Sequence, residues 1–578
     1  MFTKVLIANR GEIAVRVIRA CRELGIQSVA VYSELDRDAL HTRLADEAYA
    51  LGGQTAAESY LNTEMILDVI ERSGVDAVHP GYGFFSENAE FAKAITEKGV
   101  TFIGPPVEAI AVMGDKISAR QAAEKVGVSG VPGTTDFITT SDEVKAFASD
   151  HGYPIAIKAA YGGGGRGMKV VNSEDEIQTA IDSAQREALA YFGRDEIYME
   201  RYLTKPRHIE VQVLCDSHGN AIHLGTRDCS AQRRHQKLIE EAPAPRIPQK
   251  ILNDMGQAAV DVAKGCGYIN AGTVEFLYEN EDFYYLEMNT RLQVEHPVTE
   301  MVSGIDLVEQ QIRVASGETL PFKQEDIEMT GHAIEVRINA EDPAEGQFLP
   351  SPGRLETFKT SAGFGTRWDG GYEEGDEISQ FYDNLIGKLI CWGKDRDTAI
   401  ARTIRALTEF EISGLRTTIP ADIAILAHPD FSAVEHSTKW VEEVLDLSGV
   451  KGNPIPEAQD ISASEIRTAD IEVNGKRFDV SISVPKDSSQ VRRSASSVGA
   501  KTGGGDGQIS VPMQGTIVKI QVATGDTVES GDILVVLEAM KMENNITSDV
   551  SGTITEINVN EGDAVGAGDV IIIIETES

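Results

Sequence analysis

Two carboxylates and an amide lie close together in the segment from Ala271 to Asn289. The pattern predicts a β-hairpin around an acidic turn, which would bring Glu275, Glu287 and Asn289 near one another. Carboxylate oxygens backed by substrate phosphates are the ligands that Mg²⁺ prefers, and no His/Cys set with zinc spacing competes for the site. The hairpin therefore predicts a magnesium site, although salt bridges could account for any one of these residues.

The chain continues from this hairpin into Thr290–Pro297, where Glu295 follows Arg291 by four residues. A cation and a carboxylate thus stand beside the predicted metal, where an anion and a base would be needed together. Earlier in the chain, Arg227 to Lys237 holds five basic side chains, three arginines, a histidine and a lysine, in 11 residues. In an acidic chain such a cluster suggests a site for phosphate or bicarbonate, with a solvated run of charges as the alternative.

A glycine-rich loop, Gly162–Gly165 with Gly167, separates two β-branched runs, so we expect it to join two strands. A Walker P-loop would instead lead into a helix and carry Gly-Lys-Ser/Thr. Consecutive glycines let the backbone approach phosphates and present several N–H groups to them. Because Lys158 and Arg166 flank the loop, it suggests the mobile flap by which ATP-grasp enzymes cover a triphosphate. A flexible hairpin tip is the alternative.

The C-terminal region is an internal repeat. Residues 515–538 align with 552–575 at a constant offset of 37, with 11 of 24 positions identical. Each half alternates β-branched runs with Gly-Asp turns, which predicts a small flattened barrel. Lys541 lies in the link between the halves, at a turn that should expose it. Met540 and Met542 beside it would expose two large apolar side chains, which an ordinary surface turn avoids.

The elements that must position these residues begin with a βαβ unit. Residues 4–8 and 28–32 predict parallel strands joined by a helix that ends at Gly25. The G-x-G-x-x-G fingerprint is missing, which argues against a nicotinamide cofactor. The glycine-rich loop His79–Asn88 follows a strand and is either a ligand loop or a tight turn. Further on, Asn474-Gly475 predicts a hairpin.

Length and composition limit the number of domains, the partners and the cellular compartment that we expect. A chain of 578 residues needs several domains. A net charge of −38 and a pI near 4.7 argue against nucleic acid or an anionic membrane as partner. Five cysteines without metal-like pairing suit a reducing cytosol. The first strand begins about four residues from Met1, which leaves no room for a signal peptide, and no apolar run could span a bilayer, so we expect a soluble cytoplasmic protein.

Residues 1 to about 445 closely resemble biotin carboxylases, and the Ala-Met-Lys-Met segment at Lys541 resembles the signature of biotinyl domains. The motifs that carry the first resemblance are Ala-Asn-Arg-Gly-Glu-Ile-Ala, His-Pro-Gly-Tyr-Gly, the glycine flap, Arg-Arg-His-Gln-Lys and Glu-Met-Asn-Thr-Arg-Leu-Gln-Val-Glu-His. Together they make the chain similar to the fused α subunit of a bacterial acyl-CoA carboxylase. The resemblance implies an α/β multidomain fold with these parts: a Rossmann-like domain (1–115), an ATP-grasp domain (116–330) with a lid (about 133–204), an α+β domain (331–445), a hairpin and flexible linker (446–508) and an all-β biotinyl domain (509–578).

The same resemblance implies a role for each motif residue. Phosphates or ribose would be held by Lys116, Lys158, Gly163, Gly164, Gly165 and His208, and adenine by Glu200 and the backbone of Arg201 and Leu203. Gln232 and His235 join the cofactor-binding set, with a structural role left open for His235. Mg²⁺ (or Mn²⁺) would bind Glu275, Glu287 and Asn289, and bicarbonate would bind Lys237, Arg291, Gln293 and the backbone of Val294. Glu295 would be the base, Arg337 would stabilise the biotin enolate, and Tyr82 would lie against the biotin ring.

The implied reaction is the ATP- and bicarbonate-dependent carboxylation of biotin attached to Lys541. The implied partners are a biotin protein ligase and a carboxyltransferase β subunit, within a complex in which the chain forms a homo-oligomer. Two alternatives stay open: the corresponding subunit of a pyruvate carboxylase, and a carrier protein with an inactive ATP site. About sixty residues separate carboxylase and carrier, where many such α subunits have a long β-barrel, so the mode of docking is open.

Overall fold

The computed structural model describes residues 1–134, 137–159, 168–192, 194–453, 464–473, 476–485, 508–511, 515–539, 542–566 and 569–575. The predictions for the glycine flap, Gly163 to Gly165, and for Lys541 fall outside these residues. None of the helices in the described part is both long and apolar enough to cross a membrane.

The N-terminal region is an open parallel sheet with strand order β3-β2-β1-β4-β5. Its strands are β1 (Lys4–Ile7), β2 (Gln27–Tyr32), β3 (Glu47–Ala50), β4 (Ala77–His79) and β5 (Thr101–Phe102). The chain changes direction across the sheet between β1 and β4, and ligands of open α/β sheets bind at such a point. The loop after β1 is tied to the loop after β4, because Asn9 donates to the carbonyls of Pro80 and Tyr82, both at 2.7 Å. This confirms the βαβ prediction.

Helices cover this sheet. In α1 (Gly11–Glu23), Ile13, Val17 and Cys21 are buried against it, as their spacing predicts. The chain leaves α1 through Gly25, whose φ of +71° is a conformation that other residues adopt less readily. The other helices of residues 1–125 are α2 (Leu40–Leu44), α3 (Thr63–Ser73), α4 (Ala89–Glu97), α5 (Val107–Gly114) and α6 (Lys116–Lys125).

An eight-stranded antiparallel sheet carries the middle of the molecule, in the order β13-β12-β9-β10-β11-β14-β21-β19. The strands are β9 (Arg207–Cys215), β10 (Ala221–Arg233), β11 (Gln236–Ala242), β12 (Asn270–Glu279), β13 (Asp282–Asn289), β14 (His332–Asn339), β19 (Thr366–Gly370) and β21 (Leu385–Gly393). Because β11 pairs with β14, with Glu240 opposite Glu335, the sheet crosses residue 331 without a break. The predicted ATP-grasp and C-terminal regions therefore share one sheet.

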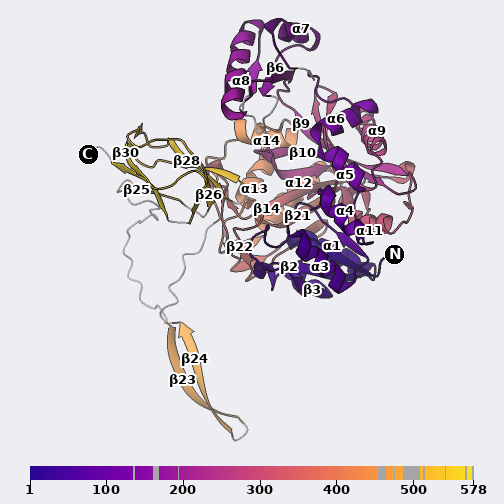
Figure 1. Ribbon diagram of the computed structural model, residues 1–578. Helices are drawn as coiled ribbons and strands as arrows, with labels where there is room; N and C mark the ends of the chain where they lie inside the picture. Colours follow the sequence, from indigo (N-terminus) through magenta and orange to yellow (C-terminus); the bar gives the residue numbers. More distant parts are fainter. Residues whose placement is uncertain are drawn as a thin grey trace.

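The lid forms a separate small layer at the top of Figure 1. Strands β6 (Ile155–Ala159), β7 (Met168–Val171) and β8 (Ile197–Arg201) pair in the order β7-β6-β8. Helices α7 (Ser141–His151) and α8 (Ile177–Phe192) share a hydrophobic core with them. The antiparallel pairing of Lys158 with Met168 confirms that the glycine-rich loop joins two strands.

The remaining helices and strands complete the carboxylase part. Helices α9 (Gln249–Gly265), α10 (His296–Ser303) and α11 (Leu307–Ala315) precede β14 in the chain. After it come α12 (Arg396–Thr408), α13 (Ile419–Ala427), α14 (Pro429–Ala433) and α15 (Trp440–Glu443), which pack with β14 and β21 in one core. Short strands are β15 (Glu341–Asp342), β16 (Leu349–Pro350), β17 (Gly353–Arg354), β18 (Thr357–Lys359), β20 (Glu377–Ile378) and β22 (Glu411–Ser413).

The C-terminal repeat folds into two four-stranded sheets, β25-β32-β30-β27 and β29-β28-β26-β31. Equivalent positions of the two halves are buried together: Ile517 with Ile554, Leu534 with Ile571, and Leu537 with Ile574. Gly515 and Gly552 are also equivalent, and a Cβ at either would lie within 2.5 Å of a neighbouring carbonyl oxygen. The strands are β25 (Gln508–Ser510), β26 (Gly515–Ile520), β27 (Thr527–Val528), β28 (Ile533–Ala539), β29 (Met542–Thr547), β30 (Gly552–Ile557), β31 (Ala564–Val565) and β32 (Val570–Glu575).

Between carboxylase and carrier, β23 (Ser464–Val473) and β24 (Lys476–Pro485) form a long two-stranded hairpin that stands apart in Figure 1. They pair along their whole length, from Ser464 opposite Pro485 to Val473 opposite Lys476. The pairing on either side of residues 474–475 is that of the hairpin predicted there.

Candidate active site

A cavity of about 1100 Å³ lies over the central sheet and gathers most of the predicted site residues. Residues from the predicted acidic hairpin, from the segment that follows it, from the basic cluster Arg227–Lys237, and from α6, β9 and β14 line it. The predicted residues among them are Lys116, His208, Gln232, His235, Lys237, Glu275, Glu287, Asn289, Arg291, Gln293, Val294, Glu295 and Arg337. The basic and acidic clusters of the sequence thus face one space.

Glu295 is a buried carboxylate of this cavity that is held by two cations. It is buried, and its Oε1 accepts from Lys237 Nζ at 2.6 Å while its Oε2 accepts from Arg337 Nη2 at 2.8 Å. Burial alone would raise the pKa of Glu295, but Lys237, Arg337 and Arg227 hold it well below its usual range. The two cations that flank Glu295 are also placed to bind a small anion beside it.

Glu210 is a site residue that sequence reasoning missed. It is fully buried, accepts from Arg227 at 2.9 Å and pairs with Lys237. The signal for it lies in strand alternation, because His208, Glu210 and Gln212 are two residues apart on β9 and so point to the same face. Arg227 in turn donates to Gln293 Oε1 at 2.5 Å. A buried layer of charges thus supports the floor of the cavity.

The predicted metal ligands meet across the β12–β13 ladder, where Glu275 is directly opposite Glu287. Asn289 Nδ2 donates to Glu275 Oε1 at 2.7 Å, and its Oδ1 accepts from Arg291 at 2.9 Å. Burial, with the charge of Glu275, raises the pKa of Glu287, and a cation between these carboxylates would offset that repulsion. The pair supplies the hard oxygen donors that Mg²⁺ requires.

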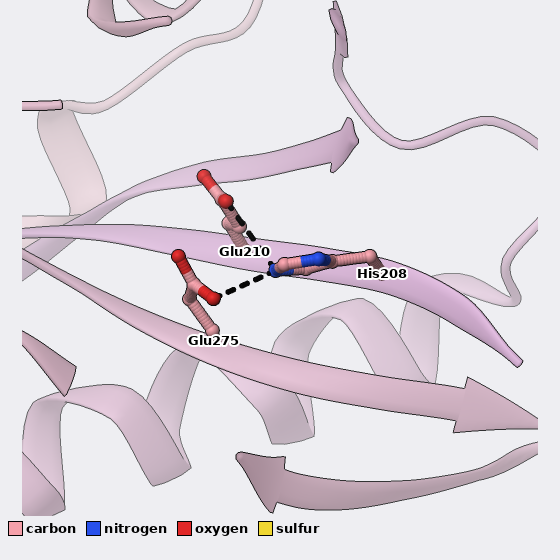
Figure 2. A group of neighbouring side chains, drawn as sticks. All are labelled: His208, Glu210 and Glu275. Carbon is pink, nitrogen blue, oxygen red and sulfur yellow. Dashed lines mark ion pairs between the residues drawn. The ribbon is translucent and has the colours of Figure 1, made fainter. Parts of the chain in front are cut away.

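A second cluster of side chains that could hold a metal ion lies beside the Glu275–Glu287 pair. Figure 2 shows His208 between Glu275 and Glu210, with Nε2 2.8 Å from Glu275 Oε2 and 3.5 Å from Glu210 Oε1. These three side chains are close enough to hold an ion. However, Glu210 is already paired with Arg227 and Lys237, and an imidazole is a poor ligand for Mg²⁺. Glu275 with Glu287 is therefore the better magnesium pair.

A smaller cavity of about 290 Å³ opens next to the first, at the direction change between β1 and β4. Tyr82 and Glu12 line it, and the Tyr82 hydroxyl donates to the Glu12 carboxylate. Arg291, Val294 and Arg337 line both cavities. Arg337 thus stands where a ligand in one cavity would meet a ligand in the other.

Four predicted nucleotide residues, Lys158, Glu200, Arg201 and Leu203, line neither cavity in the described part of the chain. All four belong to the predicted lid, about 133–204. There Lys158 pairs with Glu200, Arg201 donates to the Tyr284 hydroxyl at 2.7 Å, and Leu203 is buried. Their predicted contacts with nucleotide therefore stay predictions that depend on the position of the lid.

The carrier lies against the larger cavity. Asn545 on β29 is one of its lining residues. On β28 and β29, Ala539 pairs with Met542, and Lys541 lies between these two residues in the sequence. Strand β29 of the carrier thus borders the cavity that gathers the charged residues.

Fold and site together define an ATP-grasp type of ligase that is fused to a biotinyl-type carrier. Models of four families match the chain: biotin carboxylase N-terminal domain at residues 1–110, carbamoyl-phosphate synthase L chain ATP-binding domain at 115–323, biotin carboxylase C-terminal domain at 335–443, and biotin-requiring enzyme at 507–574. The chain is 48% identical over 568 residues to a biotin-dependent acyl-coenzyme A carboxylase alpha3 subunit of Mycobacterium leprae, covering 94% of both chains. It therefore belongs to the biotin-dependent carboxylases, with a biotin carboxylase and a biotin carrier domain.

Other relatives match the carboxylase part. A pyruvate carboxylase subunit of Methanothermobacter thermautotrophicus is 53% identical over 443 residues, 77% of this chain and 90% of that one. Among solved structures, the biotin carboxylase domain of a 2-oxoglutarate carboxylase of Hydrogenobacter thermophilus, in complex with MgADP and bicarbonate, is 48% identical with a TM-score of 0.68, covering 77% of this chain and 98% of that one. A thermophilic 2-oxoglutarate carboxylase domain bound to ADP gives 0.73 at 48% identity, with the same coverage. The cofactors are thus biotin, ATP and Mg²⁺, as the sequence predicts.

Proposed function

We propose that this biotin carboxylase charges biotin on its own Lys541 and delivers the carboxyl group to a separate carboxyltransferase subunit that acts on an acyl-CoA. The carboxylation of biotin is supported by one observation: Glu295 is held between Lys237 and Arg337, beside the Glu275–Glu287 pair. Phosphoryl transfer to bicarbonate needs charge neutralisation and positioning more than covalent help. This cavity offers both.

In the proposed reaction Glu295 removes the proton of bicarbonate. An anion bound between Lys237 and Arg337 would compete for the donors that keep the pKa of Glu295 low, so its arrival would make the carboxylate a stronger base. Arg291, Gln293 and the Val294 backbone would orient the anion, and Glu275 with Glu287 would hold Mg²⁺ against the phosphates. Arg337 would stabilise the biotin enolate, with Tyr82 against the biotin ring in the smaller cavity.

The acyl-CoA assignment is supported by how much of the chain one relative matches. The match to the acyl-coenzyme A carboxylase subunit covers 94% of this chain, whereas the match to the pyruvate carboxylase subunit covers 77%. The test is to mix the purified chain with candidate carboxyltransferase subunits, labelled bicarbonate and ATP. Acid-stable label in malonyl- or methylmalonyl-CoA is expected, and label in oxaloacetate alone would select the pyruvate alternative.

We also propose the β23–β24 hairpin as a docking element for the carboxyltransferase. It is the ordered feature of the described chain between carboxylase and carrier. Deleting residues 470–484 should abolish co-purification of the carboxyltransferase, and unchanged co-purification would exclude this role. Five free thiols fit a protein of the reducing cytoplasm, and we propose that location. There a biotin protein ligase would modify the chain, and the chain would assemble as a homo-oligomer in a larger complex.

A further inference from the structure

Lys388 on β21 is a fully buried lysine that lines neither cavity in the described chain, yet it touches the walls of both. Its Nζ donates to the Val294 carbonyl at 2.7 Å and lies 3.1 Å from Glu12 Oε1. The same Nζ lies 5.8 Å from the centre of the Tyr82 ring. One ammonium group thus contacts residues that line the two neighbouring cavities.

The first contact bears on the backbone of Glu295. The Val294 carbonyl belongs to the peptide group that leads into Glu295, the residue that precedes α10. Lys388 therefore fixes this peptide from behind, while Lys237 and Arg337 fix the Glu295 carboxylate from the cavity side. Anchored at both ends, Glu295 has little freedom to shift.

The second contact bears on Tyr82. Glu12 accepts from the Tyr82 hydroxyl and pairs with Lys388, so a continuous path runs from Tyr82 through Glu12 and Lys388 to the Val294–Glu295 peptide. A buried ammonium is costly, and a well-packed apolar side chain is often as stable or more so in its place. Stability alone thus gives little reason for a charge at this position.

We propose that Lys388 is a positioning residue that fixes Glu295 relative to Tyr82. The general base in the larger cavity and the tyrosine that lines the smaller cavity would then keep a constant relative position. This inference rests on the roles given to Glu295 and Tyr82 in the proposed function. Displacement of a catalytic group by about 1 Å can cost roughly a hundredfold in rate. Loss of Lys388 should therefore act on turnover and not on nucleotide binding.

The test compares Lys388→Met, Lys388→Arg, Glu12→Gln and the double variant Glu12→Gln/Lys388→Met in the full chain. Bicarbonate-dependent ATP cleavage with free biotin is measured, together with the KM for ATP and thermal melting. Lys388→Met should lower kcat at least tenfold with the KM for ATP within about twofold, and Lys388→Arg should recover part of the rate because it still donates. Lys359→Met is the matched control, since Lys359 pairs with Glu411 at the surface.

The double variant separates positioning from stability, because it removes both members of the buried pair. It should turn over at least tenfold more slowly than Glu12→Gln alone while melting near the wild-type temperature. A double variant as fast as Glu12→Gln would overturn the proposal, and so would one that fails to fold, which would assign Lys388 to stability. Wild-type protein without bicarbonate-dependent ATP cleavage would instead refute the proposed function itself.

Discussion

Arg337 Nη2 lies 2.8 Å from Glu295 Oε2, and this ion pair forms part of the boundary between the two cavities. On its other side Arg337 Nε donates to Glu240 Oε1 at 2.6 Å. Arg337 is thereby held between two buried carboxylates. A ligand in either cavity would therefore meet Arg337 in the position that these two carboxylates set.

Glu295→Gln should spare ATP binding and collapse bicarbonate-dependent turnover. The amide can still accept a hydrogen bond from Lys237 or Arg337 but cannot take up a proton, and loss of a positioned general base typically costs about 10²–10⁴-fold. Steady-state ATP cleavage with and without bicarbonate gives the rate, and calorimetry gives nucleotide affinity. A rate within a few-fold of wild type would show that Glu295 is not the base.

Glu240→Gln should change the pH dependence of the reaction. Burial, only partly offset by Arg337, raises the pKa of Glu240 to about 7, so the wild type loses one of the two charged partners of Arg337 as pH falls through that value. The substituted side chain is neutral at every pH, so the rate of the variant at pH 8.5 should be about tenfold lower than that of the wild type. The variant should also lack the decrease in rate that protonation of Glu240 causes in the wild type at low pH. The other titratable groups that interact with Glu240 include Glu295, Lys237, Glu335 and Asp422, which both proteins keep.

The same substitution predicts a change in thermal stability. Because the folded-state pKa of Glu240 is raised from 4.5 to about 7, the folded protein binds this proton more tightly than the unfolded chain does. Wild type should therefore lose stability from this group as pH rises from about 4.5 to 7, and Glu240→Gln should not. Melting curves across this range check the sign, and a variant that parallels wild type would contradict it.

Lys541→Arg should remove all biotin from the protein while keeping the positive charge of the unmodified lysine. The measurement is a streptavidin blot of cells that express either form, and a persisting signal would show that another residue is modified. The fragment 509–578 should be labelled by a biotin ligase without the carboxylase, because the two sheets of the repeat enclose their own hydrophobic core. An unlabelled but folded fragment would point to recognition outside it.

The purified chain should carboxylate its own biotin, yet transfer nothing to acetyl-CoA or propionyl-CoA until a separate carboxyltransferase is added. The described residues up to 453 are accounted for by the carboxylase, and those from 508 by the carrier. Labelled bicarbonate that appears in acid-stable acyl-CoA with this chain alone would exclude the prediction. Label on Lys541 in the same sample is its positive control.

Transfer between chains can be tested with two inactive forms. Asn545 of the carrier lines the cavity of its own carboxylase, so charging within one chain is expected. A mixture of Glu295→Gln with Lys541→Arg protein should then charge biotin far more slowly than wild type. Full recovery of the rate in the mixture would show that carriers serve neighbouring copies of the chain.

Local patterns predicted the site well where its residues are close in sequence. The acidic hairpin, the basic cluster and the flap strands are all predicted, because turns, β-branched runs and runs of charge are local signals. The register that sets Glu275 opposite Glu287 was not predicted, since it includes a shift between Glu275 and Phe276. Lys388 also escaped, because its contacts with Glu12 and Val294 join residues far apart in the chain and depend on the strand order of the central sheet.

The continuous central sheet has a consequence for dividing the chain. A cut near residue 330 would leave β11 and β14 on different polypeptides, and their edges would have to find each other again as an intermolecular interface. A cut after residue 453 would break none of these ladders. A cut after residue 453 therefore leaves the central sheet whole, whereas a cut near residue 330 divides it.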